Sequence, residues 1–243
     1  MRITRRAATA AIIPVLALIL FVAPSGATQD ATPTMNYSCE TAMTASPMAG
    51  MVNTSMGTPA ADDDHDMAGV GVEFDLLYID MMVPHHASII ALAQAAQNRL
   101  TDDRLQTIAG TIVADQQAEI EELRGLREQW YGSTESMPMD SAMMDMMTEM
   151  MPGMGDMNTM AMQMDPVALI TTFCDAEDPD LAFIELTIPH HEMAIRASQA
   201  ALEQATHDEI RTIAERVIQD QQREIDELEV IRAELSGDGT PTA

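Results

Sequence analysis

The sequence predicts an all-α protein, an antiparallel four-helix bundle built from two helical hairpins and one long methionine-rich crossover. Residues 75–132 align without a gap with residues 180–237, at an offset of 105 positions. Each copy holds two segments with helical periodicity, and the copies are separated by a long segment. One hairpin cannot bury both of its apolar rows alone. Two hairpins related by a pseudo-twofold axis would complete the bundle in a ferritin-like arrangement.

The first copy, residues 73–132, contains two expected helices. Apolar and small side chains recur every three or four residues from Phe74 to about Asn98. Pro84 lies inside this pattern and predicts a kink rather than a break, because proline removes one backbone hydrogen bond. A second helix is expected from Asp103 to Tyr131, and Gly132 closes it.

The second copy, residues 179–236, repeats the pattern, with helices expected over 180–204 and 207–235. Residues 133–178 join the copies, and Met137 to Met164 hold 13 methionines in 28 residues. Proline and glycine interrupt this linker, so we expect a flexible segment without a long helix.

The chain before the first copy is typical of an exported protein. Residues 1–27 have the arginine-rich start, apolar run and small-residue cleavage site of a secretory signal peptide. A permanent membrane anchor is disfavoured because the apolar run is short and rich in alanine. We expect a periplasmic, cell-surface or extracellular protein with no stable membrane insertion after cleavage.

Two further segments lack helical periodicity. Residues 28–72 are typical of a flexible leader, and residues 237–243 of a disordered tail. Within the leader, Asp62 to Met67 form an acidic cluster with one histidine. This cluster is either a solvated linker or a weak metal-capture site.

The charge balance restricts the class of partner. The chain has 39 acidic and 12 basic residues. Nucleic acid and anionic membrane surfaces are therefore poor partners, because phosphate binding needs clustered Lys and Arg. Cations are the natural counterpart of such a field. Whether the protein forms a homo-oligomer is left open.

Four of the six histidines lie in two Pro-His-His triplets, each with methionine about one helical turn away. These residues are His85, His86, Met81 and Met82 in the first copy and His190, His191 and Met193 in the second. Consecutive helical residues point about 100° apart, so one histidine of each pair can face the bundle axis and the other a neighbouring helix. Repeated pairs beside methionine favour a metal site. The alternative is a set of satisfied core or capping histidines.

Gln116 and Glu119, and their counterparts Gln221 and Glu224, lie on the apolar stripes of their helices. Buried amides and carboxylates need partners. They are metal ligands or groups that orient the histidines, or else a structural network that fixes helix register. Neither copy contains Glu-x-x-His, which argues against a di-iron oxidase or iron store.

The methionines of the linker suggest a second metal-binding region. Thioether sulfur is a soft ligand that suits Cu(I). The candidate ligands are Met143, Met144, Met146, Met147, Met160, Met162 and Met164. Core packing is a poor explanation, because the stretch lacks Leu, Ile and Val. An adaptable partner surface and an oxidant sink are alternatives.

The two regions should differ in their dependence on pH. Thioethers do not titrate, whereas binding by imidazole should fade near its reference pKa of about 6.5. Cys39 and Cys174 are the only cysteines. A disulfide between them is expected in an exported protein, and two thiols at a soft-metal site are the alternative.

The motif residues of both copies resemble the domain of unknown function 305 family. They are Tyr78, Met82, Pro84, His85, His86, Ile90, Gln116, Glu119 and Ile120 in the first copy, and Phe183, Pro189, His190, His191, Ile195, Gln221, Glu224 and Ile225 in the second. The resemblance implies a ferritin-like helical bundle in an exported protein, and some members are linked to copper binding and tolerance. Thr187 departs from the motif methionine.

The sequence therefore predicts an exported metal-binding protein. Copper is the expected metal, and scavenging, delivery or tolerance of copper is the expected role. A ferritin-like redox enzyme and a methionine-rich protein-interaction module are the alternatives. No catalytic residue is assigned.

Overall fold

The structure, a computed structural model, describes residues 37–40 and 73–237. The expected signal peptide, the Asp62 to Met67 cluster with most of the leader, and nearly all of the tail lie outside the described residues. Within the described residues the regular secondary structure is helical, without strand.

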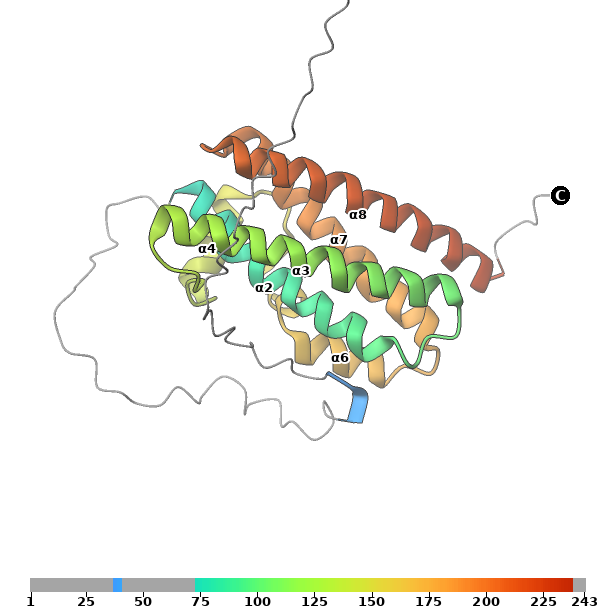
Figure 1. Cartoon of the computed structure of the whole chain (residues 1–243). Coiled ribbons are helices and arrows are strands. Elements are labelled where there is room, and N and C mark those ends of the chain that lie inside the picture. The colour runs from blue at the N-terminus through green and yellow to red at the C-terminus, as the bar shows by residue number, and fades with distance from the viewer. Residues whose placement is uncertain (1–36, 41–72, 238–243) are drawn as a thin grey trace, which may run out of the picture. The chain divides into compact units, whose positions relative to one another are not determined.

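Four long helices form the bundle and confirm the predicted all-α fold of two antiparallel hairpins. They are α2 (Phe74–Ala96), α3 (Asp103–Tyr131), α7 (Pro179–Gln204) and α8 (Asp208–Leu235). Figure 1 shows α3 and α8 on the near side, with α2 and α7 behind them. Helices α2 and α7 continue through Pro84 and Pro189. Gly132 ends α3 in the left-handed region, at φ 77°.

Helix α2 is the core helix of the bundle. It is long and apolar enough to cross a membrane by length and composition, yet 83% of its most apolar window is buried inside the protein. It packs against α3, α6 and α7. An apolar helix covered on all sides by protein is typical of a bundle interior.

Each copy caps the turn of the other through its first aspartate. Asp180 accepts hydrogen bonds from the backbone N–H groups of Thr101 and Asp102. Its counterpart Asp75 accepts from the backbone N–H groups of Thr206 and His207. Both aspartates are buried. This reciprocal contact satisfies donors that a helical hairpin alone would leave unpaired.

The linker between the copies contains three short helices, so the expectation of a flexible segment is wrong. They are α4 (Ser141–Met150), α5 (Met157–Met164) and α6 (Pro166–Cys174). Each begins at an aspartate whose carboxylate accepts backbone N–H groups, namely Asp140, Asp156 and Asp165. Asp140 and Asp156 start helices after Pro138 and Gly155, and Asp165 starts α6 directly after the end of α5, with Pro166 as its first residue.

Six methionines of the linker are at most 7% exposed, so core packing explains more of them than the sequence suggested. They are Met143, Met144, Met147, Met151, Met154 and Met160. They share one apolar cluster with Met81, Met82 and Met193. Methionine is flexible and fills irregular gaps, which suits a chain in which aromatic residues are only 3%.

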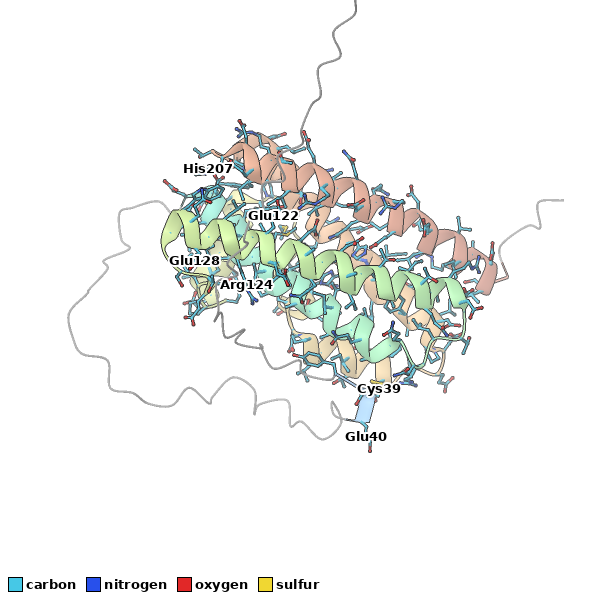
Figure 2. The ribbon with its side chains drawn as sticks, in the orientation of Figure 1. Cys39, Glu40, Glu122, Arg124, Glu128 and His207 are labelled. Atoms are coloured by element: carbon cyan, nitrogen blue, oxygen red, sulfur yellow. A yellow bond between two sulfur atoms is a disulfide. The ribbon has the colours of Figure 1, made fainter. Side chains whose placement is uncertain are left out.

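The disulfide between Cys39 and Cys174 is present, as predicted (Figure 2). It ties the described segment 37–40 to the end of α6. Arg99 donates a hydrogen bond to the carbonyl of Cys174 and lies over the Phe173 ring. Residues 37–40 and the end of the linker are thus joined to each other and to Arg99, beyond the end of α2.

We expect a fragment covering residues 73–132 not to fold as a monomer. Alone it lacks the Asp180 cap on its turn and the α7 face that covers α2. Circular dichroism and sedimentation of the fragment would measure this. A monomer that melts cooperatively would contradict the dependence of each hairpin on the other.

Candidate metal centre

Two histidines from different copies stack at the contact between α2 and α7. The ring centroids of His85 and His190 are 3.6 Å apart, with an interplanar angle of 29°. Both side chains are fully buried. The pair occupies equivalent positions in the repeat, so it lies on the pseudo-twofold axis.

The second histidine of each pair contacts the other helix of its own hairpin. His86 Nε2 lies 2.9 Å from Glu119 Oε2, and His191 Nε2 lies 2.6 Å from Glu224 Oε2. One histidine of each pair therefore faces the axis and the other a neighbouring helix, as the helical geometry indicated.

The hydrogen bonds determine which ring nitrogen carries the proton. A carboxylate only accepts, so Nε2 of His86 and of His191 donates. Nε2 of His190 lies 3.1 Å from the carbonyl oxygen of His85, which also only accepts. When an imidazole of this kind is neutral and donates from Nε2, its lone pair is on Nδ1.

The lone pairs that result have no protein partner. All four Nδ1 atoms of His85, His86, His190 and His191 are buried without a hydrogen bond, as is Nε2 of His85. Histidine ligands of metals usually donate their other N–H to a carboxylate or a backbone carbonyl. The arrangement of three of these rings matches that pattern.

Burial keeps the central pair neutral. The pKa of His85 is lowered well below its ordinary value by burial first and then by His86 and His191. The pKa of His190 is lowered by burial and then by His85, His191 and His86. Both rings therefore stay neutral and available as ligands in mildly acidic solution. Binding of metal by these two imidazoles should be lost at a lower pH than the reference pKa of histidine suggested.

Ser88 is a contact of the centre that the sequence analysis missed. Its Oγ lies 3.0 Å from His190 Nε2, 2.7 Å from the His85 carbonyl and 2.6 Å from the Gln163 carbonyl. Gln163 belongs to α5, so this hydrogen bond joins the linker to α2 next to the histidines. The only feature of the sequence that could have indicated this contact is the position of Ser88, two residues after the Pro-His-His triplet.

The second copy has Met193 where the first has Ser88. Ser88 of the first copy lies beside His190 of the second. By the same symmetry, Met193 of the second copy is expected beside His85 of the first. His85 is the ring with both nitrogens unpartnered. Met81, Met82 and Met193 are all buried, and Thr187, in place of Met82, is buried with its hydroxyl unpartnered.

The remaining predicted ligands divide by exposure and partner. Met143, Met144, Met147 and Met160 are buried, Met146 and Met164 are half-buried, and Met162 is 42% exposed. Glu119 and Glu224 contact histidines, whereas the amides of Gln116 and Gln221 have no hydrogen-bond partner.

Histidine, cysteine and carboxylate side chains alone do not form a metal site in the described residues. In residues 37–40 and 73–237, no three side chains of His, Cys, Asp or Glu are placed to hold a metal ion. The donor set that fits is imidazole nitrogen together with thioether sulfur from neighbouring methionines. Both ligand types suit copper, and thioether favours Cu(I).

Residues 25–125 and 75–232 match the model of the family described as Domain of unknown function (DUF305). The chain belongs to this family. No curated protein matches the sequence.

Two solved proteins resemble the DUF305 chain in fold. CopM in its Cu(II)-bound and Cu(I)-bound forms is 23% identical, with TM-scores of 0.50 and 0.51. The matches cover 66% of this chain and 97% and 96% of CopM. A DUF305 protein of Streptomyces coelicolor, described as secreted, is 19% identical with a TM-score of 0.53, over 67% of this chain and 92% of its own. These likenesses concern the helical fold.

We expect the metal-free protein to lose stability as the pH falls below about 6.5, the unfolded value for histidine. Below that pH His85 and His190 are protonated in the unfolded chain but stay neutral in the folded protein, because burial lowers the pKa of both. The loss should approach about 1.4 kcal/mol per pH unit for each histidine.

The double variant His85→Gln with His190→Gln should flatten this dependence. Urea unfolding at a series of pH values measures it. The same slope in the variant and the original protein would assign the acid sensitivity to other groups.

Proposed function

We propose that this DUF305 protein is an exported copper-binding protein that scavenges or delivers copper and so contributes to copper tolerance. The observation that carries the proposal is the set of buried Nδ1 lone pairs without a protein partner at the centre of the bundle. Buried methionines lie within one helical turn of three of these rings, those of His85, His86 and His190.

The energetics of burial support a ligand at this centre. An unpartnered buried polar atom costs about 1–3 kcal/mol, and five imidazole nitrogens are in this condition. Coordination of a metal would remove that cost. Glu119, Glu224 and the carbonyl of His85 would hold the imidazoles in the tautomer that coordination requires.

Copper is favoured over other metals by the donor chemistry. Imidazole and thioether together suit Cu(I), whereas carboxylate-rich sites suit harder ions. CopM, which shares the fold, has been solved with Cu(I) and with Cu(II). The formal net charge of −27 would also concentrate cations near the protein.

Export is supported by two observations on the described residues and the relatives. The disulfide of Cys39 and Cys174 is a bond that persists outside the cytoplasm. The Streptomyces coelicolor relative is described as secreted. Both agree with the signal peptide expected in residues 1–27.

The methionines of the linker would then have two roles. The six buried methionines pack the core. Met146, Met162 and Met164 retain exposure and would capture Cu(I) at the surface.

The variant His85→Gln with His190→Gln should bind Cu(I) at least roughly tenfold more weakly than the original protein, in the range typical when a metal site loses its support. Competition with a Cu(I) chelator under reducing conditions measures the affinity. His207→Gln is the matched control, because His207 pairs with Asp75 far from the centre. Equal affinities for all three proteins would refute the bundle site.

Replacement of Met146, Met162 and Met164 by leucine should lower the number of Cu(I) ions bound without lowering the melting temperature. Leucine conserves volume, so the fold should tolerate it. The comparison variant replaces three buried methionines, Met143, Met147 and Met160, by leucine. Copper analysis after dialysis gives the stoichiometry, and an unchanged number in the first set would remove surface capture from the proposal.

A further inference from the structure

Gln116 and Gln221 are buried glutamines whose amides have no hydrogen-bond partner. Each is 3% exposed, and the amide nitrogen and oxygen of both are unpartnered. They occupy the same position in the two copies. Nearly all buried polar side chains in folded proteins are satisfied, so two matched exceptions at one place indicate a ligand or water between them.

The register of α3 against α8 places these two amides opposite each other. Arg104 of α3 pairs with Glu234 of α8, and Glu122 of α3 pairs with Arg216 of α8. The helices are therefore antiparallel, and the same register places Gln116 and Gln221 at the same level of the α3–α8 seam. The amides lie on the pseudo-twofold axis, as do the stacked histidines between α2 and α7.

The level of the amides along the bundle is fixed by their neighbours. Gln116 lies one turn before Glu119, which contacts His86, and Gln221 lies one turn before Glu224, which contacts His191. The amides thus belong to the polar layer that crosses the bundle at the histidines. They approach it from the α3–α8 side, away from the linker helices that meet α2.

Carboxylates surround this position. Asp115 and Asp220 precede the glutamines, and Glu119 and Glu224 follow them.

Guanidinium groups offset part of this charge. Arg216 pairs with Glu119 and Arg223 with Asp220. Asp115 and Glu224 form no ion pair with arginine in the part of the chain that the structure describes. The seam between α3 and α8 therefore keeps an excess of negative charge beside the unpartnered amides, and a cation would be stabilised there.

We propose that Gln116 and Gln221 bind a divalent cation through their Oε1 atoms on the pseudo-twofold axis, between the carboxylates of the α3–α8 seam and the imidazoles. The carboxylates and histidines alone form no cation cluster in the described residues, so the amide oxygens supply the missing donors. Oxygen donors suit Mn²⁺, Mg²⁺ or Ca²⁺ rather than Cu(I). Its proposed ligands are amide oxygens, which the copper proposal does not use, so the two proposals can be tested separately.

The test uses the full mature chain and Mn²⁺ as the probe, with free Mn²⁺ followed by electron paramagnetic resonance. The original protein should bind one Mn²⁺ at this site. Gln116→Leu with Gln221→Leu should weaken that binding at least roughly tenfold. Its melting temperature without metal should not fall, because leucine replaces an amide that has no partner.

The repeat supplies a matched control. Gln117 and Gln222 are the next residues on the same helices, and both are exposed with amides directed at Glu121 and Asp226. Gln117→Leu with Gln222→Leu should leave Mn²⁺ binding unchanged. Gln116→Glu with Gln221→Glu should tighten it, which guards against a leucine variant that fails to fold.

Three results would overturn the site. They are equal Mn²⁺ affinity in the original protein and the buried leucine variant, equal loss in the buried and exposed leucine variants, and no tightening by glutamate. The variant His85→Gln with His190→Gln should keep Mn²⁺ binding, and loss of Mn²⁺ there would assign the ion to the imidazole centre instead. Failure of Cu(I) binding in the original protein would affect the proposed function and leave this site intact.

Discussion

The packing of α2 against α7 brings two imidazoles into contact inside an apolar core, and most of the polar architecture follows from that contact. His85 and His190 stack with both side chains fully buried, and burial holds both rings neutral. Neutral rings in this setting need donors and acceptors from the protein or from a ligand. Ser88, Glu119 and Glu224 supply some of these and leave the Nδ1 atoms without any.

Departures from the repeat make the centre chemically asymmetric. Ser88 in the first copy corresponds to Met193 in the second, and Met82 corresponds to Thr187. One side of the axis therefore offers a hydroxyl where the other offers sulfur. An internal duplication fixes the positions of the histidines, and single substitutions then decide which donor accompanies each ring.

Methionine has a structural role here as well as a chemical one. The linker helices bring Met143, Met147 and Met160 into the cluster that already contains Met81 and Met193. In a chain with few aromatic residues, flexible thioether side chains fill the space that rings would otherwise occupy. A core built in this way places many soft ligands near the histidines.

The sequence by itself determined the four long helices and the antiparallel hairpins, because periodicity and cap residues are local signals. It favoured the disulfide over two free thiols, and the structure shows the bond. It also indicated that one histidine of each pair faces the axis and the other a neighbouring helix, since consecutive helical residues point about 100° apart. The local pattern of the linker was misleading: proline and glycine suggested a flexible segment, while the N-caps at Asp140, Asp156 and Asp165 produce helices.

Tertiary structure alone decided the rest. The tautomers follow from atoms that are distant in the chain, such as the His85 carbonyl beside His190. The reciprocal caps of Asp75 and Asp180, and the burial of the unpartnered amides of Gln116 and Gln221, depend on how one hairpin packs against the other. Periodicity specifies which face of a helix is buried. It does not specify which atoms of another helix meet that face, because this depends on the register of the packed helices.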